Sequence, residues 1–363
     1  MMPRLRGIFF LVCFPALQAF FVILHLNKKS IHLYLPHNMM KKEILLVNVP
    51  RTSSSNQVYM ESFCEAWMAH GGDSIAPSKW QKYRLLRHLM KVLALLRFSC
   101  RKKNRTYVVC SRGAHLLKSS LPYAFKGEII PMLWDCWPAT WNKLERDLRL
   151  LKCRICFVTA SDVVKALSQR LPEVQFVHIP EGVDTADYQE GKPLTERSID
   201  VYEMGQKHKY FHKKLMDGRL EDHCHFVYNP NNPENGPLRV FNNWETFTSK
   251  VADSKIIISF PLSMRNPRMD GDVDTLTIRY WEAMLSRCVI VGHCPQELID
   301  MIGYNPVIEA DFVNPCSQIA DILNHIDDYQ SQVNHNREVA LHHASWSLRM
   351  DTIFHHLQIS SNK

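Results

Sequence analysis

A single carboxylate stands out in the stretch 274–292, DTLTIRYWEAMLSRCVIVG, because its neighbours are apolar. The run Val289–Val291, closed by a glycine, predicts a short buried strand, and Tyr280–Leu285 predicts a helix packed on it. Glu282 lies within that helix, where a carboxylate is costly unless something pairs with it. Arg279 lies three residues earlier on the same helical face and could form an ion pair with Glu282. A bound ligand is the other partner that this position allows.

The residues before this helix could also do chemistry. The pattern begins the helix at Thr275, with Asp274 as its N-cap, a position that aspartate favours. If this helix start points into a cleft, its free N–H groups offer a site for phosphate groups. The acidic loop MDGDVD before it also contains Asp270 and Asp272 and fits plain turn chemistry as well.

Polar and aromatic side chains follow two strands in the first half of the chain. Arg112 and His115 come after the apolar run 107–110, and Asp135 and Trp137 come after the run 128–133. Ligands of open α/β sheets bind beyond the carboxyl ends of the strands. These four residues are therefore candidates for a binding site.

Apolar runs alternate with helical patterns from residue 42 onward. Solid apolar strands separated by helices predict parallel sheets covered on both faces. A polar stretch near 182–197 lacks apolar periodicity and divides the pattern into two series. The predicted strands are 44–49, 107–110, 128–133, 154–159 and 174–179 in the first series, and 198–204, 225–228, 255–260, 289–291 and 307–309 in the second.

Composition limits the classes of function. The chain has 363 residues, 46% of them hydrophobic, which is enough for two globular domains, and a formal net charge of +8. This basic excess suits a phosphate-bearing ligand or an anionic membrane surface, although a solvated basic surface explains it equally. A dense basic stripe with interleaved aromatic residues is missing, so we expect no nucleic-acid partner. A dinucleotide dehydrogenase is disfavoured because no G-x-G-x-x-G follows a strand.

Cysteine and histidine usage gives no metal site. The eleven cysteines are scattered through predicted strands and helices, as in a protein of a reducing compartment. Cys153 and Cys156 form one C-x-x-C, but no second pair stands at zinc spacing. The cluster 223–225 (HCH) also lacks a partner cluster and is explained by alternation along a strand.

The first forty residues form a separate segment. Residues 7–26 contain no Asp, Glu, Lys or Arg, and their number is at the lower edge of the ~20 needed to cross a bilayer. A cleaved signal peptide would need an A-x-A-like site, which is missing. The sequence MMKKEILLVNVP from Met39 is typical of the start of a cytosolic domain. We therefore expect a cytoplasmic protein whose segment 7–26 is either an attachment to the inner face of the membrane or an upstream extension.

Three motifs then occur in order, IPEGVD (179–184), IDVYEMGQKH (199–208) and RYWEAMLSRCVIVGHCPQEL (279–298). Together they resemble the nucleotide-sugar glycosyltransferases of GT-B fold, with the family-4-type and CgeB-like bacterial enzymes as the nearest subgroup. The resemblance covers residues 175–358, and before 175 it rests on the order of strands and helices. It implies an α/β architecture of two Rossmann-like doubly wound domains facing a cleft. The expected parts are 42–182 as acceptor domain, 183–340 as nucleotide-sugar donor domain, and 341–363 as a C-terminal helix that crosses back to the first domain.

The resemblance gives Glu282 and Asp274 roles in catalysis. Glu282 matches the acidic residue that binds the ribose hydroxyls of the donor, which fits a carboxylate accepting charge-assisted hydrogen bonds. Asp274 stands eight positions earlier, where the family carries the first glutamate of an E-x7-E pattern. Its side chain is one methylene shorter, and Asp270 or Asp272 could act at the donor sugar instead.

The family also places cations near the diphosphate of the donor. Gly205 matches a glycine that lets the backbone approach a phosphate, whereas Gln206 replaces an expected arginine. Lys207 or Lys209 could supply the charge, although a solvated basic face explains these lysines equally. Two arginines lie on the facing loop 261–271. The expected donor-binding residues are Gly205, Lys207, Arg265, Arg268, Thr275, Arg279 and Glu282.

In the first domain we expect the acceptor. Arg112, His115 and Trp137 are the candidate acceptor-binding residues, with the Trp137 ring as a wall for a sugar. Asp135 would hydrogen-bond acceptor hydroxyls and is a candidate base. Trp141 is explained by packing under the helix that follows.

The resemblance thus implies a glycosyltransferase of hexosyltransferase type that acts in cell-surface polysaccharide synthesis. It would move a sugar from a nucleotide diphosphate sugar to a glycan or glycolipid, retaining the anomeric configuration, with no cofactor and no metal. Two alternatives stay open. A nucleotide-sugar epimerase of the same fold would need a tighter set of acids and bases in the first domain. A degenerate, non-catalytic binding protein of the cell envelope would explain the departures at Asp274 and Gln206.

Overall fold

The computed structural model describes residues 43–49, 58–78, 84–95, 104–232, 236–237, 240–241, 243–265, 271 and 273–358. Contacts divide the chain into the units Met1–Lys41 and Lys42–Lys363, and the described residues all belong to the second. The hydrophobic segment 7–26 and the candidates Arg268, Asp270 and Asp272 lie outside the described residues. No helix within the described ranges is long and apolar enough to cross a membrane.

The first half of the described chain forms a six-stranded parallel sheet in the order β2-β1-β3-β4-β5-β6. The sequence pattern missed β2 because it has three residues and only one of them is aliphatic. The strands are β1 (Glu43–Val47), β2 (Asp73–Ile75), β3 (Arg105–Arg112), β4 (Glu128–Trp134), β5 (Ile155–Val158) and β6 (Gln175–His178).

The second half forms a five-stranded parallel sheet in the order β13-β12-β11-β7-β8. A short antiparallel pair, β9 and β10, lies in the turn-rich stretch after β8. The strands are β7 (Ile199–Glu203), β8 (Phe226–Tyr228), β9 (Asn231–Asn232), β10 (Gly236–Pro237), β11 (Ser254–Ser259), β12 (Val289–Gly292) and β13 (Val307–Glu309).

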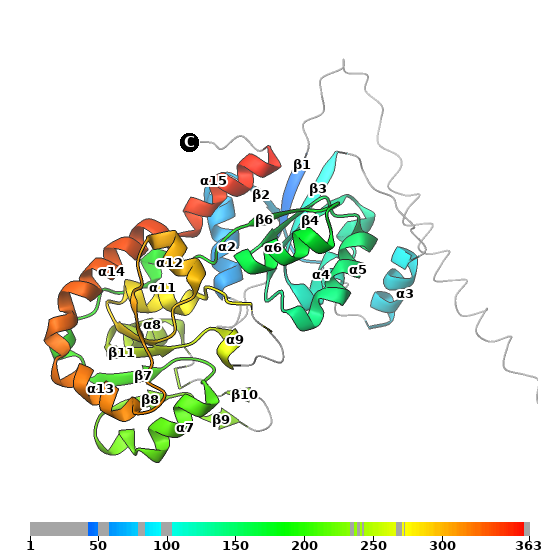
Figure 1. The fold of residues 1–363 in the computed structure, drawn as a ribbon. Coiled ribbons are helices and arrows are strands. Elements are labelled where there is room, and N and C mark those ends of the chain that lie inside the picture. The colour runs from blue at the N-terminus through cyan, green and yellow to red at the C-terminus, as the bar shows by residue number, and fades with distance from the viewer. Residues whose placement is uncertain are drawn as a thin grey trace, which may run out of the picture. The chain divides into compact units, whose positions relative to one another are not determined.

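Helices cover both faces of each sheet (Figure 1). In the first lobe these are α2 (Val58–Ala69), α3 (Arg84–Leu95), α4 (Leu116–Ser120), α5 (Trp141–Leu151) and α6 (Ser161–Arg170). In the second lobe they are α7 (Lys209–Asp217), α8 (Trp244–Ala252), α9 (Leu262–Arg265), α11 (Ile278–Leu285), α12 (Gln296–Ile302), α13 (Pro315–Asn324) and α14 (Gln330–His343). The last helix is α15 (Trp346–Leu357).

Strand alternation explains why each lobe has two cores. On β3, Tyr107 and Val109 pack under α3–α6, whereas Val108 packs under α2 and α15. On β11, Ile257 packs under α8, α11 and α14, whereas Ile256 packs under α7 and α13. Both sheets are therefore buried on two sides, and the prediction of two doubly wound α/β units is confirmed.

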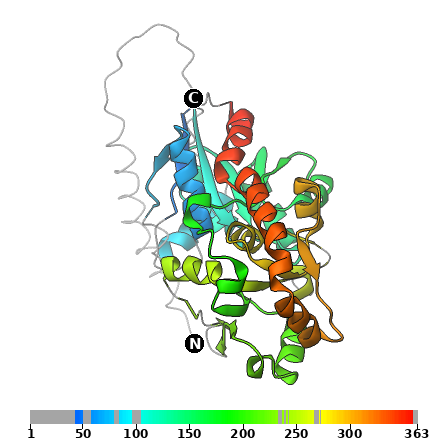
Figure 2. The same ribbon diagram turned by 90° about the vertical axis from the view of Figure 1, so that its left-hand side faces the viewer.

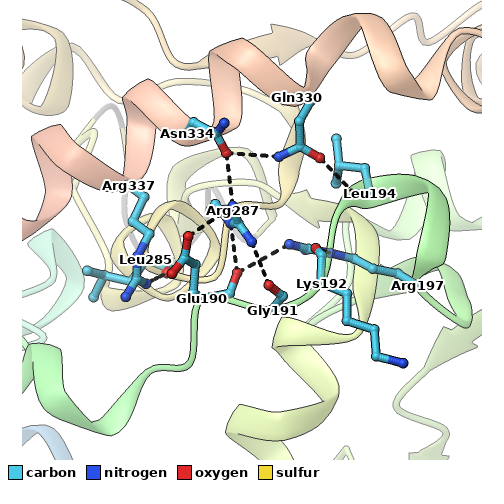
Figure 3. A network of polar contacts seen from close by, with 10 residues as sticks. All are labelled: Glu190, Gly191, Lys192, Leu194, Arg197, Leu285, Arg287, Gln330, Asn334 and Arg337. Carbon is cyan, nitrogen blue, oxygen red and sulfur yellow. Dashed lines mark hydrogen bonds and ion pairs between the residues drawn. The ribbon is translucent and has the colours of Figure 1, made fainter.

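The polar stretch 182–197 between the sheets is fixed to the second lobe by arginines (Figure 3). Arg287, at the end of α11, donates to the carbonyl oxygens of Glu190 (3.0 Å) and Gly191 (2.5 Å). Arg197 is buried and donates to Lys192 O (2.9 Å) and Ser254 O (2.8 Å). These side chains satisfy backbone oxygens of residues 190–192, which lie outside the strands.

Helix α15 returns to the first lobe and lies beside α2 (Figures 1 and 2). Ser345 caps its start by accepting the N–H of Ser347 at 3.1 Å. The Phe354 ring packs edge-on against Trp67 of α2, with ring centroids 4.9 Å apart. Trp346 contacts Phe63 in the same way at 5.2 Å. The C-terminal helix therefore completes one core of the first lobe, as predicted.

This packing makes the first lobe depend on α15. Because Phe354 is 2% exposed, we expect Phe354→Ala to lower the free energy of unfolding by about 3–5 kcal/mol in a denaturant titration. Leu348→Ala on the same helix, where the side chain is 51% exposed, should change it by less than about 0.5 kcal/mol. Equal effects of the two substitutions would show that α15 does not complete this core.

Candidate functional site

Helix α11 begins later than the sequence predicted. Its first residue is Ile278 and its N-cap is Thr277, whose side chain makes no capping bond. The first N–H is instead bound across the lobes, because Glu181 Oε2 accepts the N–H of Ile278 at 3.1 Å. Glu181 follows β6 of the first lobe. The start of α11 thus lies where the two lobes meet.

The prediction that Asp274 caps this helix is wrong. Asp274 Oδ2 accepts the N–H of Gln296 at 3.2 Å, so that it caps α12 instead. The physical reason is that Val273 is buried in the core of the first lobe, and the chain crosses between the lobes before the helix can start. Burial raises the pKa of Asp274, and the Gln296 bond and His293 oppose that rise. Its predicted contact with the donor sugar stays a prediction.

Three unpartnered polar atoms lie at the start of α11. Thr275 Oγ1, Thr277 Oγ1 and Arg279 Nη1 are buried and make no hydrogen bond. Thr275 is only 5% exposed. Because a buried polar group without a partner costs free energy, such groups need an explanation, and a polar ligand that supplies the missing partners is one.

Gly205 and Arg279 are in direct contact. Gly205 follows β7 with a φ of +69°, a conformation that favours glycine. A Cβ atom at this position would lie 3.1 Å from Cζ and Nε of Arg279. The glycine therefore leaves room for the guanidinium beside the backbone.

Arg265 contacts Gln206, the uncharged residue found where the resemblance leads us to expect an arginine. Its Nη1 donates to the backbone oxygen and to Oε1 of Gln206, both at 3.2 Å, and its Nε donates to Phe260 O at 3.0 Å. Gln206 replaces the arginine expected after Gly205, so the structure brings a cation to the same loop from α9.

The first lobe contributes an ion pair at the same junction. Arg112 Nε lies 3.1 Å from Asp135 Oδ2, and the Tyr59 hydroxyl lies 3.4 Å from Nε and Nη2 of Arg112. Asp135 follows β4 with a φ of +50°. Burial raises its pKa, whereas the guanidinium groups of Arg112 and Arg265 lower it. Burial, helped by the charge of Asp135, raises the pKa of Tyr59 to about 12.

Glu181 is the functional candidate that sequence reasoning missed. Burial and the nearby charge of Asp135 raise its pKa from 4.5 to about 8, against the opposing effect of Arg279 and the Ile278 N–H. The signal was present, since IPEGVD places an acidic residue directly after a buried strand. Nothing in the sequence showed that two carboxylates from the ends of β4 and β6 would come together.

Glu282 lies on the buried side of α11. It is 3% exposed, and its Oε1 accepts a hydrogen bond from the Tyr188 hydroxyl at 3.1 Å. The charge of Glu282 raises the pKa of Arg279, which burial lowers. The ribose contact of Glu282 stays a prediction.

The other predicted residues lie around this cluster. Lys207 places its Nζ 4.7 Å from the ring centre of Tyr228. Trp137 is 9% exposed, so that little of its ring could touch a sugar. His115 is exposed. Partial desolvation of its ring, together with the positive charges of nearby lysines and Arg112, lowers its pKa.

A second polar contact joins the lobes beside this site. Glu297, in the first turn of α12, accepts from His178 Nε2 at 2.7 Å and from the N–H of Ser161 at 3.3 Å. Both partners belong to the first lobe, at the end of β6 and the start of α6. Glu297 is 7% exposed, so that removing one partner would leave a buried group unpaired.

Solved structures share the fold of this chain. Sucrose-phosphate synthase from Thermosynechococcus elongatus matches with a TM-score of 0.60 and 12% identity, over 87% of this chain and 98% of that one. The chain has the GT-B fold. Anabaena Alr3699/HepE, solved in complex with UDP, matches with a TM-score of 0.51 and 10% identity, over 88% of this chain and all of that one. No protein-family model matches the chain, and no curated protein matches it in sequence. The family-4-type or CgeB-like subgroup stays a prediction.

The raised pKa of Glu181 predicts how stability varies with pH. Between pH 4.5 and about 8 the folded state holds a proton that the unfolded state has released, so stability falls as pH rises through this window. We expect Glu181 to contribute a loss of about 3–4 kcal/mol from pH 5 to pH 8, measured by denaturant titration. In the Glu181→Gln variant, the free energy of unfolding should lose this part of its dependence on pH. Parallel profiles for both proteins would contradict the assignment.

Proposed function

We propose that this protein is a glycosyltransferase that moves a sugar from a nucleotide diphosphate sugar to a hydroxyl of a glycan or glycolipid. The observation that carries the proposal is the group of buried, unpartnered polar atoms at the start of α11, beside the Arg279 guanidinium and Gly205. A diphosphate supplies the acceptors that these donors lack. The GT-B fold supports it, since two lobes with parallel sheets meet at this point.

Stabilisation of the leaving nucleotide diphosphate is the main chemical task. The developing negative charge has to be met by fixed donors in a site that excludes water. Arg279 and the hydroxyls of Thr275 and Thr277 can do this from one side, and Arg265 from the other. We propose that these groups act without a metal ion, with Glu282 holding the ribose behind them.

The acceptor would approach from the first lobe. Asp135 ends β4 next to Arg112, and its raised pKa suits a group that exchanges protons. We propose that Asp135 orients the attacking hydroxyl, with Arg112, His115 and Trp137 around the acceptor. Retention of the anomeric configuration, hexose transfer and a place in cell-surface polysaccharide synthesis are proposals that rest on the sequence resemblance.

A nucleotide-sugar epimerase is the second candidate, and one observation favours it. Such an enzyme needs acids and bases in the first lobe, and Asp135 lies close enough to Glu181 for its charge to raise the pKa of Glu181. An epimerase would turn over the donor with no acceptor present. The two candidates share the donor site and differ in what the first lobe does.

Binding of nucleoside diphosphates tests the proposal most simply. We expect one base to be preferred in calorimetric titrations, with UDP tested first because HepE was solved with it. Arg279→Lys keeps the charge but loses the planar fork, so it should weaken binding by about tenfold or more. Lys213→Met, whose side chain is 72% exposed, is the control and should change nothing. No binding by any nucleoside diphosphate would refute the donor site.

Turnover then separates the candidates. Sugar release or transfer that depends on an added glycan or glycolipid identifies a transferase, and isomerisation of the sugar without an acceptor identifies an epimerase. Binding with neither activity would indicate a non-catalytic binding protein.

A further inference from the structure

The carboxylate of Glu181 already occupies part of the proposed diphosphate site. It accepts the N–H of Ile278, the first residue of α11, at 3.1 Å. This N–H is one of the donors that a phosphate at the helix start would need. We infer that Glu181 is an internal competitor of the donor, so that a phosphate binds only when the Glu181 carboxylate withdraws. The inference rests on the proposed function of this site.

The backbone of Glu181 is fixed, whereas its side chain can leave. Glu181 O accepts the indole N–H of Trp281 at 3.0 Å. Two residues later the backbone is held by the last crossing of the chain, since Val183 donates to Ala344 O at 2.9 Å and accepts the N–H of Trp346 at 3.3 Å. Rotation of the side chain alone would therefore free the helix start without moving the lobes apart.

Electrostatics favours such a release. The nearest groups that oppose the negative charge of Glu181 are Asp135 and Glu297, and the cation that favours it is Arg279. Above the raised pKa of Glu181, a phosphate beside Arg279 would interact with this guanidinium and repel the ionised carboxylate. While Glu181 binds the Ile278 N–H, Thr275 Oγ1 and Thr277 Oγ1 have no hydrogen-bond partner. The carboxylate therefore satisfies only some of the polar groups at the helix start. A phosphate has more acceptor oxygens and could satisfy them.

The inference makes an unusual prediction about affinity. Removal of a charged residue from a binding site normally weakens binding. In titrations at about pH 9, where Glu181 with its pKa of about 8 is ionised, Glu181→Gln and Glu181→Ala should instead tighten the binding of UDP and of pyrophosphate by roughly tenfold, because a like charge is removed. The affinity for uridine, which has no phosphate, should not change. Asp184→Asn is the matched control, since it neutralises an exposed carboxylate three residues later in the same loop.

Isothermal titration of the full chain with UDP, pyrophosphate and uridine gives distinct outcomes. Tighter phosphate binding by both Glu181 variants and unchanged binding by Asp184→Asn support the inference. Equal or weaker binding by the Glu181 variants overturns it and leaves the donor site standing. Tighter pyrophosphate binding with no nucleotide binding supports the inference and refutes the proposed function. No binding of any ligand by any variant refutes both.

Discussion

The contact between a carboxylate of the first lobe and the first N–H of α11 determines how the rest of this site is arranged. A helix start carries donors that have to be satisfied, and here a residue from the other lobe satisfies one of them. The helix therefore cannot be described from the second lobe alone. Thr275 and Thr277, just before the helix, and Arg279, in its first turn, carry polar atoms that have no partner while Glu181 binds the Ile278 N–H.

The lobes are joined by contacts of two kinds. The apolar contacts are buried in the cores of the first lobe, which include Val273 and the inner face of α15 from the second half of the chain. Polar contacts lie nearer the strand ends, where Glu181 binds Ile278 and Glu297 binds His178. The apolar contacts hold the lobes in register, and the polar ones place charged groups of both lobes around one position.

The sequence predicted the fold well because the fold depends on local patterns. Solid aliphatic runs such as Ile256–Ile258 are typical of strands buried on two faces, and ten of the strands were found in this way. The prediction failed where tertiary contacts decide. Asp274 has the sequence context of an N-cap for α11, but the burial of Val273 in the other lobe delays the helix to Ile278 and leaves Asp274 to cap α12.

The site was predicted in part for the same reason. Gly205 and Arg279 carry local signals and do meet, and Arg112 and Asp135 form a pair at the edge that the strand-end rule indicates. Arg265 was expected near the donor from its place on the facing loop, but its hydrogen bond to Gln206, 59 residues away in the sequence, is a contact that no local pattern reports. The sequence did not identify Glu181 because its raised pKa and its hydrogen bond come from Asp135 and Ile278, which are close to it in space but far from it in the sequence.

A crystal structure of the protein with a bound nucleoside diphosphate would test the central claim most directly. We predict that a phosphate oxygen lies within hydrogen-bond distance of the Ile278 N–H and of Arg279, and that the Glu181 carboxylate has rotated away. A diphosphate bound elsewhere, with Glu181 still on the Ile278 N–H, would contradict it.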